Sequence, residues 1–182
     1  GAEGVLRTLT VHYANDAELA LALAEGQPRA AAAAWDRFAQ VVRTLLWKAL
    51  GPNDDVDDLV QDVFITLFRR VRDLRDPNAL GSFVVGVTIR TARSELRRRR
   101  VRRWVALTPL GVLPDVEVPH VDVTGRAAVR KLYGILDELD SEARLAFVLR
   151  HTEGLELTEI AEALGCSLAT AKRRLAKANE RV

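Results

Sequence analysis

Apolar residues recur at three- and four-residue spacing along most of this 182-residue chain, and no strand-like alternation runs comparably far. Such spacing places apolar side chains on one face of a helix. It predicts helices over residues 16–25, 30–50, 55–71, 82–104, 126–139, 141–152 and 157–164, and a last helix from Leu168. We therefore expect an all-α fold.

One long stretch, residues 106–124, contains three prolines and interrupts the helical pattern. Prolines at this spacing exclude a continuous helix and favour an extended path. The sequence thus predicts two small helical domains, residues 1–105 and 125–182, joined by an extended linker.

Two local features of the helices can be predicted. Trp35 begins an apolar stripe with Phe38 and Val42, so we expect it to pack in the core. Ser141 directly precedes the helical pattern of its segment and is a candidate N-cap.

The predicted helix over residues 55–71 carries a hydrophobic residue on its polar face. Its apolar residues fill one half of a helical projection, whereas the opposite arc holds Asp58, Gln61, Asp62 and Ile65. A β-branched side chain among acids and an amide is typical of a contact surface for another protein. Single exposed hydrophobic residues are also common, so the pattern leaves both interpretations open.

Charge is segregated along the chain, although the net charge is only +2. Eight arginines and one acid lie from Arg90 to Arg103, with Arg90, Arg93, Arg97 and Arg100 on one helical face. Such a row can follow a phosphate backbone, whereas a solvated helix end is the alternative. Acids predominate from position 137 to 162, with eight acids and two bases.

The last two predicted helices form a helix-turn-helix pattern. Ile160 and Leu164 precede Gly165, which permits a sharp turn, and Ser167 is a candidate cap of the last helix. The outward face of that helix carries small residues and bases, and two further bases flank it. The face holds Ala169, Thr170, Arg173 and Lys177, and the flanking bases are Lys172 and Arg174. Small side chains with bases between them suit a helix that enters the major groove, although a solvated hairpin is the alternative.

The sequence shows no pattern typical of a catalytic or metal site. Its three histidines have no cysteine or carboxylate at metal-ligand spacing, and Cys166, the single cysteine, is expected to be a small packed residue. Phosphate-binding glycine loops and nucleophile motifs are missing. The longest apolar stretches are six residues, whereas a membrane helix needs about 18. We expect a cytoplasmic protein without enzymatic activity, metal, cofactor or membrane insertion.

Two of these motifs together resemble the sigma-70 family of bacterial RNA polymerase sigma factors. Residues 55–64 (DVDDLVQDVF) are similar to the acidic helix that docks on the polymerase clamp. Residues 153–175 resemble the family's promoter-reading helix-turn-helix. With two domains and a linker, the chain is similar to the compact extracytoplasmic-function (ECF) group.

The resemblance implies a sigma factor that binds core RNA polymerase and directs promoter-specific transcription initiation. The implied contacts on polymerase are the clamp helices of the largest subunit and the flap of the second-largest subunit. The N-terminal domain would dock on the clamp and open the minus-ten element, the C-terminal domain would read the minus-thirty-five element, and the linker would thread through the active-site channel. An anti-sigma factor that covers both DNA-facing surfaces is also implied.

The resemblance assigns roles to particular residues. The polymerase-binding set is Asp58, Gln61, Asp62 and Ile65. In the same domain, residues 75–81 would form a loop that captures a flipped base, and residues 80–100 would form the helix that melts the promoter. The minus-ten set is Arg75, Asn78, Ser82, Phe83, Arg90, Arg93, Arg97 and Arg100. The minus-thirty-five set is Ser167, Ala169, Thr170, Lys172, Arg173, Arg174 and Lys177. The family often has Trp at Phe83, Asn at Arg90 and Asp at Ser94, so the minus-ten sequence does not follow from the resemblance.

Two other functions compete with that of a sigma factor. A helix-turn-helix regulator that acts without replacing the sigma subunit would explain the basic clusters, but not the docking-like helix with Ile65. An all-helical enzyme would explain neither feature.

Overall fold

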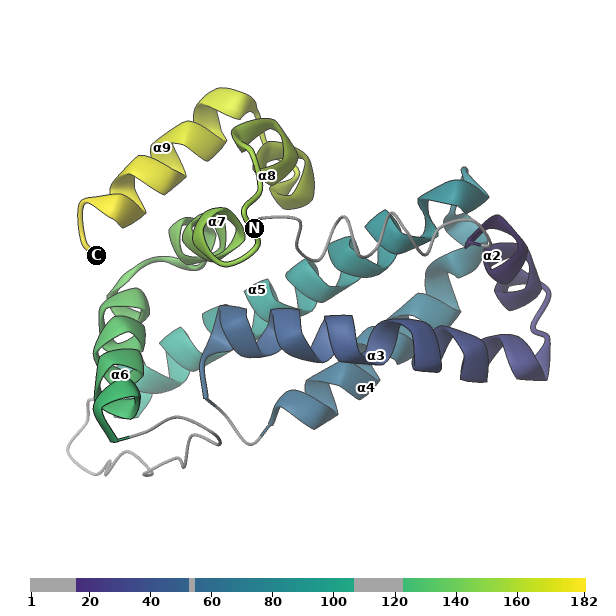
Figure 1. Ribbon diagram of the computed structural model, residues 1–182, viewed down its shortest axis with the longest axis horizontal. Coiled ribbons are helices and arrows are strands. Elements are labelled where there is room, and N and C mark those ends of the chain that lie inside the picture. The colour runs from purple at the N-terminus through teal and green to yellow at the C-terminus, as the bar shows by residue number, and fades with distance from the viewer. Residues whose placement is uncertain (1–15, 53–54, 107–122) are drawn as a thin grey trace.

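The structure, a computed structural model, describes residues 16–52, 55–106 and 123–182, and every regular element in these ranges is helical. The N-terminal part contains α2 (Asp16–Ala24), α3 (Pro28–Leu50), α4 (Val56–Arg70) and α5 (Leu80–Ala106), with short 3₁₀ turns η2 (Val71–Asp73) and η3 (Pro77–Ala79) before α5. The C-terminal part contains α6 (Val123–Glu138), α7 (Ser141–His151), α8 (Leu157–Leu164) and α9 (Leu168–Asn179). The all-α prediction is confirmed (Figure 1). Most of the predicted linker lies outside the described residues.

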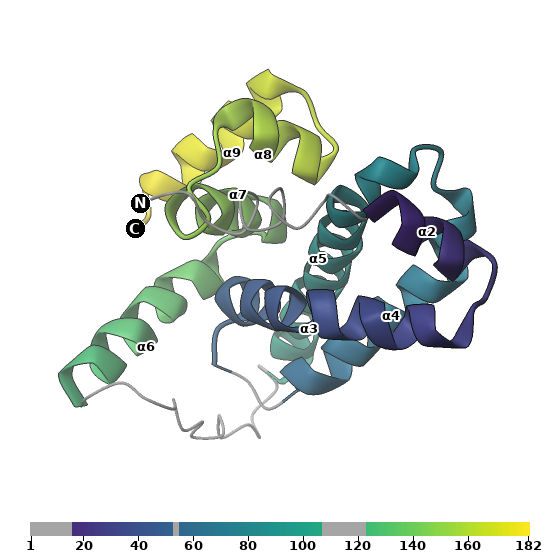
Figure 2. The same ribbon diagram turned by 45° about the vertical axis from the view of Figure 1, so that its right-hand side comes forward.

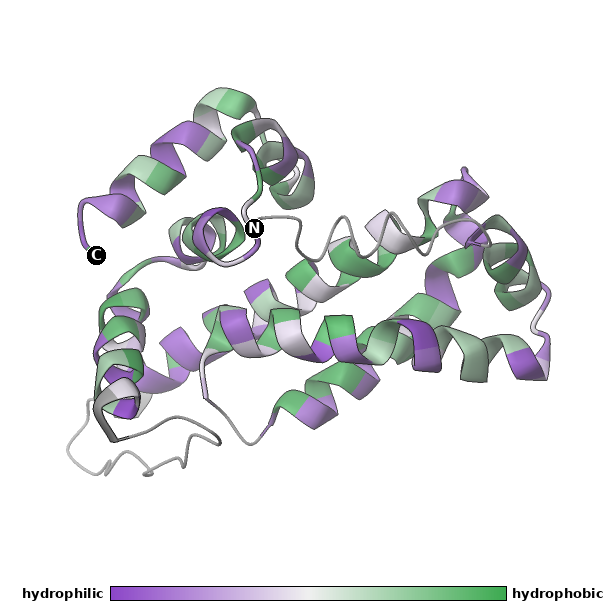
Figure 3. Cartoon of the chain, viewed as in Figure 1, coloured by the Kyte–Doolittle hydropathy of each residue, from purple (hydrophilic) through white to green (hydrophobic). Residues whose placement is uncertain are grey.

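Helices α3, α4 and α5 pack on one another and enclose the core of the N-terminal part. Phe38 and Leu46 of α3, Val60 and Val63 of α4, and Ile89 of α5 are all buried. They come from the apolar stripes of their helices, and most of the polar positions of these helices (Figure 3) are outside the core. The three- and four-residue spacing thus fixes which face of each helix is turned inward.

Trp35 is not a core residue, contrary to the prediction from spacing. Its side chain is 38% exposed, and its ring lies against Phe64 with the centroids 4.7 Å apart. A tryptophan ring is large enough to cover apolar neighbours while its outer edge stays in water. Trp35 therefore closes the edge of the bundle.

The helix-turn-helix prediction is confirmed in its local geometry. Gly165 ends α8 in the left-handed conformation, with φ 63° and ψ 44°, which a glycine adopts without strain. The Ser167 hydroxyl accepts a hydrogen bond from the Thr170 backbone N–H at 3.2 Å and caps α9. The turn and the cap together fix the direction in which α9 leaves α8.

Asp140, and not Ser141, is the N-cap of α7. Its Oδ1 accepts hydrogen bonds from the backbone N–H groups of Glu142 (3.1 Å) and Ala143 (2.9 Å). Burial by itself raises the pKa of Asp140, but the hydrogen bond from Lys177 and these N–H donors outweigh it and hold the pKa below its ordinary value. A charged carboxylate is a stronger partner than a hydroxyl for the positive helix end, which explains why the cap falls one residue earlier.

The two parts of the chain share one hydrophobic core. Leu145 and Leu149 of α7 and Ile160 of α8 are buried in the same cluster as the apolar residues of α3 and α5. Helix α7 packs on α3 and α5, and α8 packs on α5 (Figure 2). The C-terminal part therefore lies directly on the N-terminal part.

The end of α3 is a second point of contact between the parts. Three carbonyl groups of its last turn accept hydrogen bonds from side chains of other helices: Lys48 from Tyr133 (2.9 Å), Ala49 from Arg144 (2.7 Å) and Leu50 from Arg99 (3.1 Å). The last carbonyls of a helix have no partner within it, so these donors replace water there. The side chains of α5, α6 and α7 thus meet at the C-terminus of α3.

We expect Gly51→Ala to destabilise the protein by about 3 kcal/mol. Gly51 has φ 81° and ψ −177°, a backbone region that only glycine adopts readily, and an added Cβ would lie 2.7 Å from the Tyr133 ring. Gly26→Ala is the matched control, because Gly26 also has a positive φ but no atom within 4 Å of an added Cβ. The control should cost about 1 kcal/mol. Urea unfolding measures both, and equal losses would contradict the close contact with Tyr133.

Candidate nucleic-acid interface

The four residues predicted to bind polymerase lie together on the exposed face of α4. Asp58, Gln61 and Asp62 are exposed, and Ile65 is 46% exposed among them. The opposite face of the same helix is buried, with Val60, Val63 and Leu67 in the core. Packing in the core therefore does not explain why position 65 carries a large apolar side chain.

An aromatic row beside this face was missed from the sequence. The Phe64 ring lies between Trp35 of α3 and Phe68, whose centroid is 5.9 Å away. Phe68 is 37% exposed and stands one turn after Ile65. The position of Phe68 at the edge of the apolar stripe could have indicated this exposure, because a bulky side chain at such an edge extends into solvent. The exposed apolar surface is therefore larger than Ile65 alone.

The segment before α5 and the first turn of α5 present polar side chains at the surface. Arg75, Asn78 and Ser82 are exposed, and the Asp76 carboxylate accepts hydrogen bonds from the backbone and side-chain N–H groups of Asn78 at 3.0 and 3.2 Å. Phe83, the candidate stacking residue, is half-buried and packs against the core. The loop and the start of α5 thus place one partly accessible aromatic ring beside several hydrogen-bonding groups.

Positive charge is concentrated along α5. Burial lowers the pKa of the Arg90 guanidinium, and the neighbouring charges of Arg70 and Arg93 lower it further. Farther along, a cavity of about 190 Å³ lies between α5 and α7, and its lining combines four arginines with one acid and three other residues: Arg97, Arg100, Arg103, Arg144, Asp140, Leu96, Leu139 and Ser141. Arg97 pairs with Glu142, and Arg103 and Arg144 pair with Asp137, so part of this charge is already compensated within the protein. The exposed arginines of α5 remain able to attract an anion such as a phosphate backbone.

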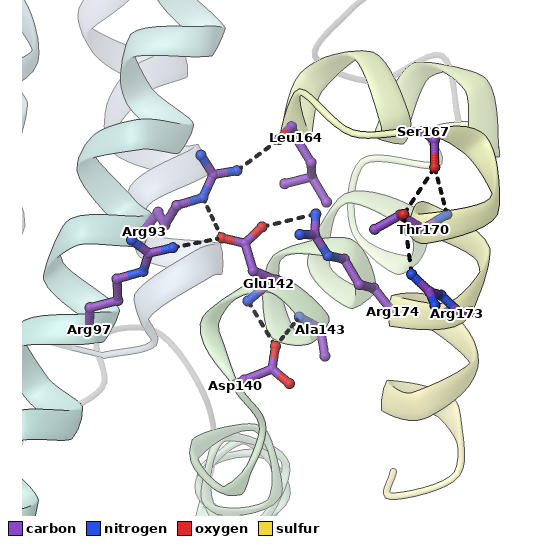
Figure 4. A network of polar contacts seen from close by, with 10 residues as sticks. All are labelled: Arg93, Arg97, Asp140, Glu142, Ala143, Leu164, Ser167, Thr170, Arg173 and Arg174. Carbon is purple, nitrogen blue, oxygen red and sulfur yellow. Dashed lines mark hydrogen bonds and ion pairs between the residues drawn. The ribbon is translucent and has the colours of Figure 1, made fainter.

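The first turns of α9 form the exposed face of the helix-turn-helix. Ser167, Ala169, Lys172 and Arg173 are exposed, and Thr170 is half-buried. The Thr170 hydroxyl lies between two partners, since it accepts from the Ser167 hydroxyl at 2.9 Å and from Arg173 at 3.4 Å (Figure 4). These contacts hold Arg173 beside the start of the helix.

Four of the predicted DNA-binding residues are engaged by acids of α7 and its cap. Glu142 lies within ion-pair distance of Arg93, Arg97 and Arg174, and Asp140 pairs with Lys177 at 2.5 Å. The segregation of acids into residues 137–162 is an indirect signal of these pairs in the sequence. It did not reveal which bases those acids meet, because the partners are distant along the chain.

The described residues show neither a metal-binding cluster nor a membrane-spanning helix. No three His, Cys, Asp or Glu side chains gather there as a metal ion would require. None of the helices within residues 16–52, 55–106 and 123–182 is both long and apolar enough to span a membrane. Cys166 is half-buried and packs against the core, as expected for a small packed residue.

Comparison with known proteins places two family models on this chain. The model described as "Sigma-70 region 2" matches residues 34–102, which include α4 and nearly all of α5. The model described as "Sigma-70, region 4" matches residues 130–182, which include α7, α8 and α9. The matches therefore cover both candidate surfaces.

Several curated proteins are similar over most of their length. The ferric citrate uptake sigma factor FecI of Escherichia coli K12 is 30% identical, over 76% of this chain and 80% of that protein. The ECF RNA polymerase sigma-E factor of Haemophilus influenzae is 26% identical, over 80% of this chain and 82% of that protein. Among solved structures, CnrH in complex with the cytosolic domain of CnrY matches with a TM-score of 0.61 and 22% identity, over 92% of this chain and 94% of that one. This last likeness supports the fold.

Proposed function

The chain belongs to the sigma-70 family, in its ECF group, and on that premise we propose a division of labour between its two parts. As a sigma factor it binds RNA polymerase and directs transcription initiation at promoter DNA. The N-terminal part, residues 1–105, would dock on polymerase and open the promoter. The C-terminal part, residues 125–182, would read the upstream element, and the intervening linker would thread through the active-site channel.

The polymerase contact is assigned to the exposed face of α4. Ile65 stands among Asp58, Gln61 and Asp62 on the face opposite the core, and Phe68 adds a partly exposed ring. An apolar anchor surrounded by polar groups is the usual arrangement at the centre of a protein interface. The proposed partner of this face is the clamp helices of the largest polymerase subunit, with the flap of the second-largest subunit as a further contact of the protein.

Promoter opening is assigned to α5 and the loop before it. The arginine row would hold the DNA backbone, since each neutralised phosphate releases counterions. Phe83, with its partly accessible ring, would stack on an unpaired base of the minus-ten element. Arg75, Asn78 and Ser82 would contact the same base or its neighbours.

The minus-thirty-five element is assigned to the first turns of α9. A recognition helix reaches base edges with the residues near its N-terminus, and those farther along meet backbone. Thr170 and Arg173 are therefore the proposed base contacts, with Lys177 as a phosphate contact. Ser167, Ala169, Lys172 and Arg174 complete the face.

We expect Arg173→Ala to cost about 1–3 kcal/mol on the preferred promoter and to relax the choice of base at one position. Lys177→Ala is the comparison, because a phosphate contact carries no sequence information and its loss should weaken all sites about equally. Competition binding by holoenzyme to a library randomised across the upstream element separates the two. If Arg173→Ala weakens every sequence by the same factor, Arg173 only positions the helix.

A single observation carries this assignment: two exposed surfaces of opposite character lie on different helices, one acidic with an apolar centre on α4 and one basic on α9. The test is footprinting of the holoenzyme on DNA from upstream of the protein's own gene. Protection of the minus-thirty-five element and permanganate-reactive thymines at the minus-ten element are expected. Protection by the protein alone, undiminished when polymerase is absent, would instead favour a helix-turn-helix regulator.

An inhibitory protein partner is also proposed. CnrH, which shares this fold, has been solved in complex with the cytosolic domain of CnrY. By analogy, an anti-sigma factor would cover the two DNA-facing surfaces of this chain, on α5 and α9, and release it in response to a signal. Sigma-70 family members are initiation factors, and we propose that this protein contributes no catalytic group to transcription and works in the cytoplasm beside the polymerase.

A further inference from the structure

Two exposed apolar residues, Val101 and Trp104, lie at the end of α5. Val101 is 63% exposed and Trp104 is 74% exposed, the largest fraction among the large hydrophobic side chains of the described ranges. Helix α5 is continuous in Figure 1, so both residues lie at the opposite end of the helix from Phe83. Core packing therefore accounts for neither side chain.

This apolar pair shares a helical face with the arginines that precede it. At about 100° per residue, the face spans an arc of about 100° and contains no acid. From the start of α5 to its end, its residues are Ser82, Phe83, Gly86, Arg90, Arg93, Arg97, Arg100, Val101 and Trp104. An aromatic ring thus lies near each end of the face, with the arginine row between the two rings.

The last turns of α5 are strongly basic where Trp104 is exposed. Residues 96–106 contain six arginines and no acid. Arg97 and Arg100 are both exposed on the face of Trp104, and the Arg97 side chain keeps 67% of its surface in solvent although it lies 3.4 Å from Glu142. Proteins bind nucleic acid with this combination, because guanidinium groups hold phosphates while an aromatic ring packs on a sugar or a base.

Phe83 and Trp104 are far enough apart to contact different parts of a promoter. They are 21 positions apart on one helix, which corresponds to about 32 Å. That length spans about nine base pairs of duplex DNA. Opening must extend from the minus-ten element to the start site, so the DNA that stays paired lies upstream. With Phe83 at the minus-ten element, Trp104 reaches this paired DNA.

We propose that Trp104 contacts the backbone of the duplex between the minus-ten and minus-thirty-five elements. This inference rests on the proposed function. The indole ring packs against a deoxyribose and its Nε1–H donates to a phosphate oxygen, while Arg97 and Arg100 hold neighbouring phosphates. Such a contact carries no base sequence. It sets the position of α5 along the duplex and adds affinity at every promoter.

The test measures binding of the holoenzyme to two DNA fragments from upstream of the protein's own gene. One fragment contains both promoter elements, and the other begins at the minus-ten element, as mapped by footprinting, and lacks the duplex between the elements. We expect Trp104→Ala to weaken binding to the first fragment about tenfold and to leave binding to the second unchanged. Trp104→Phe keeps an aromatic ring but loses the N–H donor, so its loss on the first fragment should be intermediate.

Leu21→Ala is the control, because it removes an exposed apolar side chain from α2, and it should bind both fragments like the wild type. The exposure of Trp104 implies that Trp104→Ala keeps the melting temperature of the wild type. Equal losses on the two fragments, or a lower affinity for core polymerase, would overturn the inference, because the ring would then contact polymerase. Wild-type binding of Trp104→Ala to both fragments would overturn it as well.

Run-off transcription with the wild-type protein keeps the two proposals apart. If the wild type directs transcription but Trp104→Ala binds both fragments normally, the duplex contact fails and the proposed function stands. If the wild type directs no transcription, the proposed function fails and the duplex contact fails with it.

Discussion

Replacing Arg93, Arg97 and Arg100 together with glutamine is expected to weaken promoter-complex formation by the holoenzyme and to flatten its dependence on salt. Each arginine that contacts a phosphate contributes roughly 0.9 to the slope of log affinity against log salt concentration. Glutamine keeps the helix propensity, but the change also removes the contacts of Arg93 with Glu142 and with the Leu164 carbonyl, so the melting temperature of the variant is measured beside its affinity. The measurement is filter binding of holoenzyme to promoter DNA over a range of salt concentrations.

The control removes the same charge away from the row. Arg29, Arg43 and Arg72 lie on or beside other helices, and Arg43 and Arg72 are engaged by Asp57 and by the Ala24 carbonyl respectively. Their triple replacement should leave the salt slope close to that of the wild type. An unchanged slope in the Arg93, Arg97 and Arg100 variant would mean that the row is a solvated helix end.

Ile65→Glu should weaken binding to core polymerase while leaving the fold intact. Loss of an anchor at the centre of an interface commonly costs on the order of 2 kcal/mol or more. Ile65 is 46% exposed and lies opposite the buried stripe of α4, so the substitution should leave the packing of the core unchanged. Titration of labelled protein with core polymerase gives the affinity, and the melting temperature reports the fold.

Leu21→Glu is the matched control for that experiment. Leu21 is 53% exposed on α2, so the substitution places the same charge on another solvent-facing apolar position of the N-terminal part. It should bind polymerase like the wild type. If Ile65→Glu also binds with unchanged affinity, the α4 face is not the docking surface.

The helices and their inward faces could be predicted from the sequence because they depend on local spacing. Ile65 is exposed where the projection of its helix puts it, and Gly165 and Ser167 form the turn and cap that their residue types favour. These features involve neighbours within a few residues of one another. Which side chains contact polymerase or DNA stays a prediction.

The remaining features depend on contacts between distant segments. Arg93 and Glu142 are far apart along the chain, and no periodicity reveals that they meet. Trp35 follows the apolar spacing but lies at the edge of the bundle. Lys177 of α9 donates a hydrogen bond to the Asp140 carboxylate that caps α7, a contact that no local pattern indicates. The pattern of a sequence thus predicts which face of each helix is buried. Which residues of other helices that face contacts depends on how the helices pack.

The most direct test of the central claim is run-off transcription with purified core RNA polymerase on DNA from upstream of the protein's own gene. A transcript from one defined start site should appear only when this protein is added. Core polymerase that gives no such transcript with this protein, yet initiates on a standard promoter with another sigma factor, would contradict its assignment as the subunit that directs initiation there.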